Sequence, residues 1–91
     1  MIGKRIIVTG RVQGVFFRNW TVAKALELGV DGWVRNRSDG SVEIHACGAA
    51  EAIGRLIDAC RSGPPAAAVE RVEVRDSVEP CSAGFGKKPT L

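Results

Sequence analysis

Hydrophobic and polar residues alternate in several short runs of this chain, and a period of two is typical of strands with one buried face. These runs predict four strands, at residues 4–10, 32–37, 41–47 and 69–76. The third run alternates most clearly, and its inward row consists of Val42, Ile44 and Ala46. Its other row, which we expect to face solvent, consists of Ser41, Glu43 and His45. Phe85 begins a candidate fifth strand, which is short because glycine and proline follow it.

Two other segments repeat their apolar residues every three or four positions, which is the spacing of one helix face. The first helix is expected from about residue 18 to Leu28, and Gly29 is placed to end it in the left-handed conformation. Its apolar stripe consists of Phe17, Thr21, Ala25 and Leu28, widened by Val22 and Leu26. The second helix is expected from about Ala49 to Cys60, and its stripe consists of Ala52, Ile53, Leu56, Ile57 and Cys60.

The order of these elements is β-α-β-β-α-β, with Asp39-Gly40 as a hairpin turn between the second and third strands. Two helices of this length can cover one face of a four-stranded antiparallel sheet. The order therefore predicts an α+β, ferredoxin-like two-layer sandwich, with the short fifth strand at an edge. At 91 residues we expect one domain, spanning residues 1–91.

The chain is mildly basic, with 13 Lys and Arg against 10 Asp and Glu. This balance suits a small anionic substrate or weak nucleic-acid contact, and it does not choose between them. No apolar run approaches the roughly 20 residues that span a bilayer, and the N-terminus does not look like a signal peptide. We therefore expect a cytoplasmic protein with no membrane partner.

The three cysteines are Cys47, Cys60 and Cys81, an odd number without a Cys-x-x-Cys pair. This pattern argues against a disulfide framework and against a zinc site. The one histidine, His45, does not complete a metal-ligand spacing with them. We therefore expect buried free thiols, no metal and no cofactor, and a reducing intracellular compartment.

The stretch from Gly10 to Arg18 leaves the first strand and enters the first helix. Backbone N–H groups are unpaired at a helix start, and glycines let neighbouring amides turn toward one point. Arg18 can add a planar guanidinium to the same anion. On spacing alone, this is either a phosphate or carboxylate site or a tight turn with an exposed arginine. Asn36 shares strand parity with Val34 and ends its strand, so it either faces a cavity or belongs to the turn.

Two blocks of sequence, Gly10 through Arg18 and Gly29 through Asn36, resemble the acylphosphatase signature. The likeness is dense over residues 5–47 and looser through Gly84-Phe85. It implies a ferredoxin-like enzyme that cleaves the carboxyl–phosphate bond of acyl phosphates. It assigns phosphate binding to Arg18 and positioning of the attacking water to Asn36. It also implies that the phosphoryl oxygens are cradled by the loop amides of Gln13, Gly14, Val15, Phe16, Phe17 and Arg18.

The chain departs from that family after Phe85, where relatives usually alternate apolar residues and this sequence has Gly86, Lys87 and Lys88. Asn19 and Trp20 occupy positions that we regard as variable, so we assign them no role. The departure bears on the edge of the sheet and leaves the two signature blocks intact.

The chemistry implied by the resemblance needs no general acid, because a carboxylate with an acid pKa of about 4 to 5 is a good leaving group. It also requires no metal, and the sequence shows no metal-ligand cluster. The main alternative is a ferredoxin-like nucleic-acid-binding module without enzymatic activity, but the 41–47 strand lacks the aromatics of such modules. Two further alternatives are a carbamoyl-phosphate-handling unit of a larger protein and an inactive relative. We expect a monomer that binds a small acyl phosphate and no nucleic acid.

Overall fold

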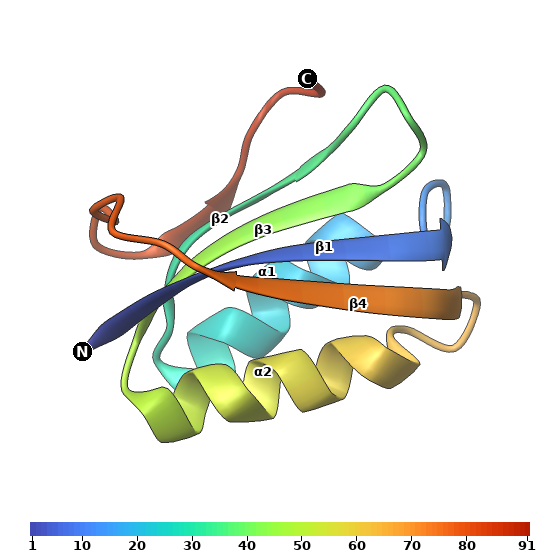
Figure 1. The fold of residues 1–91 in the computed structure, drawn as a ribbon. Coiled ribbons are helices and arrows are strands. Elements are labelled where there is room, and N and C mark those ends of the chain that lie inside the picture. The colour runs from blue at the N-terminus through green and yellow to red at the C-terminus, as the bar shows by residue number, and fades with distance from the viewer.

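The computed structural model describes all of residues 1–91, which form one five-stranded sheet with two helices on one face (Figure 1). The strands are β1 (Ile2–Arg11), β2 (Asp31–Asn36), β3 (Val42–Gly48), β4 (Ala68–Asp76) and β5 (Phe85–Lys87). The helices are α1 (Phe17–Leu28) and α2 (Ala50–Ser62). The predicted ferredoxin-like β-α-β-β-α-β order is confirmed, including the short fifth strand.

The strands lie in the order β4-β1-β3-β2-β5. The first four strands pair antiparallel, whereas β5 pairs with β2 in parallel. The sheet is therefore mixed, and β5 forms the short edge strand beside β2 in Figure 1. After β5 the chain stays attached to β2, because the Lys88 N–H donates to the Val34 carbonyl and the Leu91 N–H donates to the Asn36 carbonyl.

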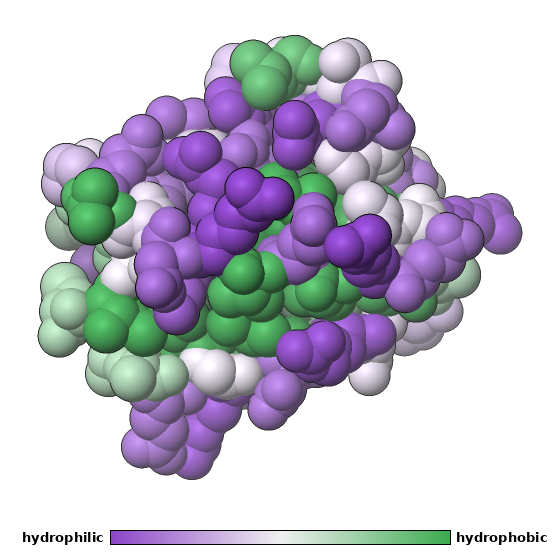
Figure 2. All heavy atoms as spheres, in the orientation of Figure 1, coloured by the Kyte–Doolittle hydropathy of each residue, from purple (hydrophilic) through white to green (hydrophobic).

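The hydrophobic core lies between the sheet and the helices, and the predicted inward row of β3 is fully buried there, together with Ile6 and Val8 of β1. In the predicted α2 stripe, Ile53, Leu56 and Cys60 are buried, and the other two residues, Ala52 and Ile57, are partly buried against the core. In α1 the prediction for Leu26 is wrong, because this side chain is 58% exposed. Nine residues at 3.6 per turn make about two and a half turns, so Leu26 points away from the buried Phe17. Figure 2 shows the rim of the core as a hydrophobic band between β4 and α2.

On the sheet face opposite the helices, the central strand β3 is also covered, and the expectation that Ser41, Glu43 and His45 face solvent is wrong. His45 is 0% exposed and Glu43 is 4% exposed. The Glu43 carboxylate lies between two guanidinium groups, with Arg35 Nε at 2.7 Å and Arg5 Nε at 3.4 Å. Charged neighbours and the chain segment that follows β4 thus bury the outer side chains of β3, which strand alternation alone predicts to be exposed.

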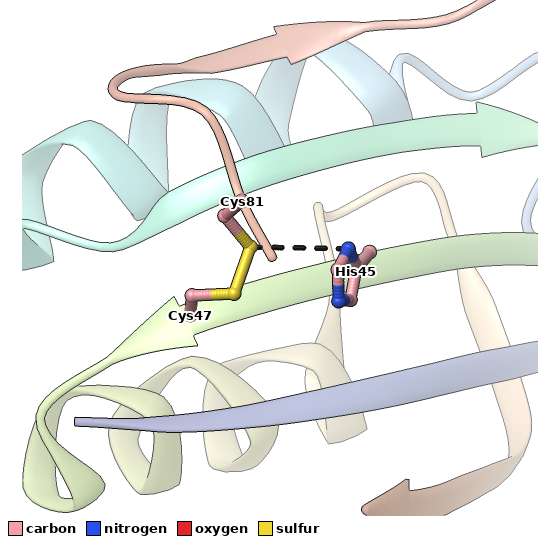
Figure 3. A group of neighbouring side chains, drawn as sticks. All are labelled: His45, Cys47 and Cys81. Carbon is pink, nitrogen blue, oxygen red and sulfur yellow. Dashed lines mark hydrogen bonds between the residues drawn. A yellow bond between two sulfur atoms is a disulfide. The ribbon is translucent and has the colours of Figure 1, made fainter. Parts of the chain in front are cut away.

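That segment is held to the sheet by a disulfide between Cys47 of β3 and Cys81 (Figure 3). The expectation of free thiols is therefore wrong for these two cysteines and is confirmed for Cys60, which is free and buried. Cys47 and Cys81 are 34 positions apart. They meet because the chain folds back over β3 after β4, a long-range event that leaves no mark in cysteine spacing.

Candidate active site

The loop between β1 and α1 combines buried anchors with an unusual backbone. Val12, Val15 and Phe17 are buried in the core and fix the loop at three points. Between them, Gly14 has φ +72° and Phe16 has φ +63°, both in the left-handed region. A non-glycine residue rarely adopts this conformation, and such strain occurs often at binding sites. The Phe16 side chain is 79% exposed, so no packing interaction of its own explains it.

The backbone N–H groups of residues 14–18 donate to no acceptor in the protein. The first hydrogen bond of α1 runs from the Trp20 N–H to the Phe16 carbonyl, at 3.0 Å. The first turn of α1 contains Arg18 and no acidic residue. Unpaired amides, the positive end of the helix dipole and a guanidinium therefore meet at one place, and this combination favours an anion.

A cavity of about 290 Å³ lies at this helix start. Of the residues predicted from the sequence, Gly14, Phe16, Phe17, Arg18 and Asn36 line it, whereas the side chains of Gln13 and Val15 do not. Val12 also lines the cavity, and so do two residues without a predicted role, Asn19 and Lys87. No carboxylate lines the cavity.

Neither of the two basic residues of this cavity, Arg18 and Lys87, takes part in an ion pair of the protein. Four larger hollows lie elsewhere, among them one beside the N-terminal residues and one beside Trp33, and none of the four is lined by Arg18 or Asn36. The cavity at the helix start is thus the one that gathers the predicted site.

The Gln13 side chain joins the two predicted parts of the site. Its Nε2 donates to the carbonyl oxygens of Arg37, at 2.8 Å, and Ser41, at 2.9 Å, on either side of the turn that follows Asn36. In that turn the Asp39 carboxylate accepts hydrogen bonds from the Ser41 hydroxyl and the Ser41 N–H, which lower the pKa of Asp39 below its ordinary value. The Gln13 side chain therefore fixes the loop to the end of β2, and its amide N–H groups are used in doing so.

The fold also brings together three potential metal ligands whose spacing in the sequence argues against a metal site. Donor atoms of His45, Cys47 and Cys81 all lie within 4.8 Å of one another, so the spacing argument was wrong about their proximity (Figure 3). The two sulfur atoms are bonded to each other, and a disulfide does not offer the thiolates that metals bind. This cluster lies on the far side of the sheet from Arg18.

Comparison with known proteins in sequence and in structure identifies the family of this chain. A sequence profile described as Acylphosphatase matches residues 4–86. An acylphosphatase of Rhizorhabdus wittichii is 52% identical over 90 residues, which cover 99% of this chain and 91% of that protein. The crystal structure of acylphosphatase from Bacillus subtilis superposes with a TM-score of 0.91 at 38% identity, covering 97% of this chain and 99% of that one. An acylphosphatase structure from Coxiella burnetii superposes with a TM-score of 0.92 at 40% identity, covering 96% and 92%. Sequence, fold and cavity agree: this chain belongs to the acylphosphatase family.

Proposed function

We propose that this acylphosphatase family member holds the phosphoryl group of an acyl phosphate between Arg18 and the loop amides of residues 13–18. Asn36 positions the water that attacks phosphorus, and the products are a carboxylate and inorganic phosphate. The single observation that carries this assignment is the common cavity, in which Arg18, Asn36 and a helix start with unpaired amides meet without a carboxylate.

The arrangement suits phosphoryl transfer, because this reaction depends mainly on positioning and on stabilising charge at the equatorial oxygens. The Arg18 guanidinium offers two parallel N–H groups to two of these oxygens, and the amides supply further donors. The leaving carboxylate is stable as an anion, so the reaction needs no general acid. We propose that neither a metal nor a cofactor takes part, and that the phosphate itself accepts the proton of the attacking water.

The test is hydrolysis of benzoyl phosphate in the presence of EDTA by the wild type, Arg18→Ala and Asn36→Ala. Loss of one preorganised donor costs about 10²-fold or more in turnover, and we expect Arg18→Ala to fall by at least that factor. Arg55→Ala is the matched control, because Arg55 is an exposed arginine of α2 paired with Glu51. It should keep full activity. A folded wild type without turnover would overturn the function, and activity that chelation abolishes would overturn the metal-free mechanism.

We also propose that residues 1–91 act as one monomeric domain that binds no nucleic acid. The second part is supported by the covered sheet face, since His45 and Glu43 are buried where ferredoxin-like RNA-binding domains expose stacking aromatics. Sedimentation tests the monomer. An RNA-binding assay in about 50 mM salt tests the absence of nucleic-acid binding, because electrostatic contact with nucleic acid is strongest at low salt. Measurable binding there would contradict the proposal.

No helix of the structure is long and apolar enough to cross a membrane. We retain the cytoplasm as the proposed location, although Cys47 and Cys81 no longer support it as free thiols would. Disulfides are rare in reducing compartments, so this location predicts that the two cysteines are reduced inside the cell. Alkylation of thiols before lysis, followed by mass analysis, tests it, and a fully formed bond in unstressed cells would contradict the proposal.

A further inference from the structure

Lys87 lies where strand alternation calls for an apolar side chain. In the parallel pairing of β5 with β2, Lys87 is opposite Val34 and Phe85 is opposite Gly32. Val34 and Phe85 are buried on the helix-covered side of the sheet. Side chains at matched positions of neighbouring strands share a face, so Lys87 emerges on that side too. Asn36, two residues after Val34, lies on the same face.

The Lys87 ammonium is held at the cavity. Its Nζ donates a hydrogen bond of 2.7 Å to Oδ1 of Asn19, which follows Arg18 in the first turn of α1. An ammonium has three N–H donors, so two remain after this bond. No carboxylate lines the cavity, and no ion pair neutralises Lys87. Asn19 therefore positions a free cation that faces the same space as Arg18.

We propose that Lys87 is a second cationic residue that binds the phosphoryl group, beside Arg18 and the loop amides. The inference rests on the proposed function for the identity of the anion. A phosphoryl group carries more negative charge than one guanidinium balances, and a lysine adds a point charge with donors that adapt to the remaining oxygen. Because this contact is available to substrate, transition state and product phosphate alike, Lys87 acts mainly on binding and less on turnover.

The test compares wild type, Lys87→Met and Lys88→Met. Lys88→Met is the matched control, because this substitution removes the same charge from the next position. The Lys88 ammonium lies 4.7 Å from the centre of the Trp33 ring. Titration calorimetry with inorganic phosphate measures binding without any turnover. Benzoyl phosphate gives KM and kcat separately. Circular dichroism confirms that both variants fold, and Lys87→Arg tests whether a cation alone restores binding.

We expect Lys87→Met to weaken phosphate binding about fivefold or more, to raise KM by a similar factor and to leave kcat within about twofold, as for loss of a charge-assisted bond that is partly screened by water. Lys88→Met should match the wild type, and Lys87→Arg should recover most of the loss. The difference between Lys87→Met and wild type should shrink as salt rises.

Equal phosphate affinities of Lys87→Met and Lys88→Met would overturn the proposal. A loss seen only with an acyl phosphate whose acyl group carries a second carboxylate would also overturn it, since Lys87 would then recognise the acyl group. Phosphate binding that depends on Lys87 in a protein without turnover would leave this inference standing while the proposed function failed.

Discussion

Replacing both Cys47 and Cys81 by serine should lower the free energy of unfolding by about 4 kcal/mol. The two residues are 34 positions apart, and their bond closes a loop that contains α2 and β4. In the chain-entropy account, the bond lowers the entropy of the unfolded chain by about 2.1 + 1.5R ln n cal/mol/K, where n is the number of residues in the loop. For the 34 positions between the two cysteines this is about 13 cal/mol/K. At 25 °C this is about 4 kcal/mol. Domains of this size have total stabilities of about 5–15 kcal/mol, so the change is large.

Urea unfolding measures this effect for the wild type and the Cys47→Ser, Cys81→Ser variant, each with and without dithiothreitol. With a slope of about 1–2 kcal/mol per molar urea, the midpoint of the oxidised wild type should lie about 2 M or more above that of the variant. Dithiothreitol should lower the wild-type midpoint toward that of the variant. It should leave the variant unchanged, because the remaining thiol, Cys60, is unpaired. Identical midpoints for the oxidised proteins would refute the reasoning.

Three further predictions concern single residues. Gly32→Ala would place a Cβ atom 1.8 Å from the His45 carbonyl oxygen, and thermal unfolding should show a stability lower by more than about 3 kcal/mol. As a control, the Cβ of Gly40→Ala meets open space, so this variant should lose only about 1 kcal/mol because of its left-handed backbone. Burial raises the pKa of the Cys60 thiol to about 12, so a disulfide reagent at pH 8 should label Cys60 only after denaturation, and full labelling of the native protein would contradict the burial. The buried neutral thiol contributes its full stability below the unfolded pKa of about 8.5, and this contribution is lost as the pH rises toward 12. Gln13→Ala removes two hydrogen bonds between the loop and the turn after β2, although both carbonyl oxygens keep a backbone N–H partner. At about 0.5–1.5 kcal/mol for each bond, the variant should lose about 1–3 kcal/mol in urea unfolding and show a raised KM for benzoyl phosphate. Unchanged values would show that the loop holds its shape alone.

Local periodicity predicted those parts of the fold that a short stretch of chain decides for itself. The inward row of β3 depends only on a strand period of two, and it is buried as expected. The stripe of α2 depends only on a helix period of 3.6, and three of its five residues are buried while Ala52 and Ile57 are partly buried. Arg18 and Asn36 were named from two signature blocks, and the fold brings them to one cavity. Leu26 was misplaced because widening the helical stripe ignored its angular position.

The remaining features depend on contacts between distant segments. His45 and Glu43 are buried by charged neighbours and by a chain segment without any repeating pattern, so the alternation of their own strand could not reveal it. The bond between Cys47 and Cys81 depends on the same fold-back. Lys87 did carry a usable signal, since it has the parity of Phe85. Its strand, however, pairs in parallel with β2 between residues 53 positions apart (85−32 = 53), and no local rule predicts such a pairing.

The strand order has a consequence for local opening of the native protein. Arg18 and its loop follow β1, which is paired on both sides, whereas Lys87 belongs to a three-residue strand that is paired on one side only. Amide hydrogen exchange should therefore be slow along β1 and β3 and fast along β5. When β5 frays, Lys87 leaves the cavity while the Arg18 loop keeps its shape. The anion site is thus built from a loop that follows a strand paired on both sides and from an edge strand paired on one side only. Phosphate should slow amide exchange along β5 as well as at the unpaired loop amides.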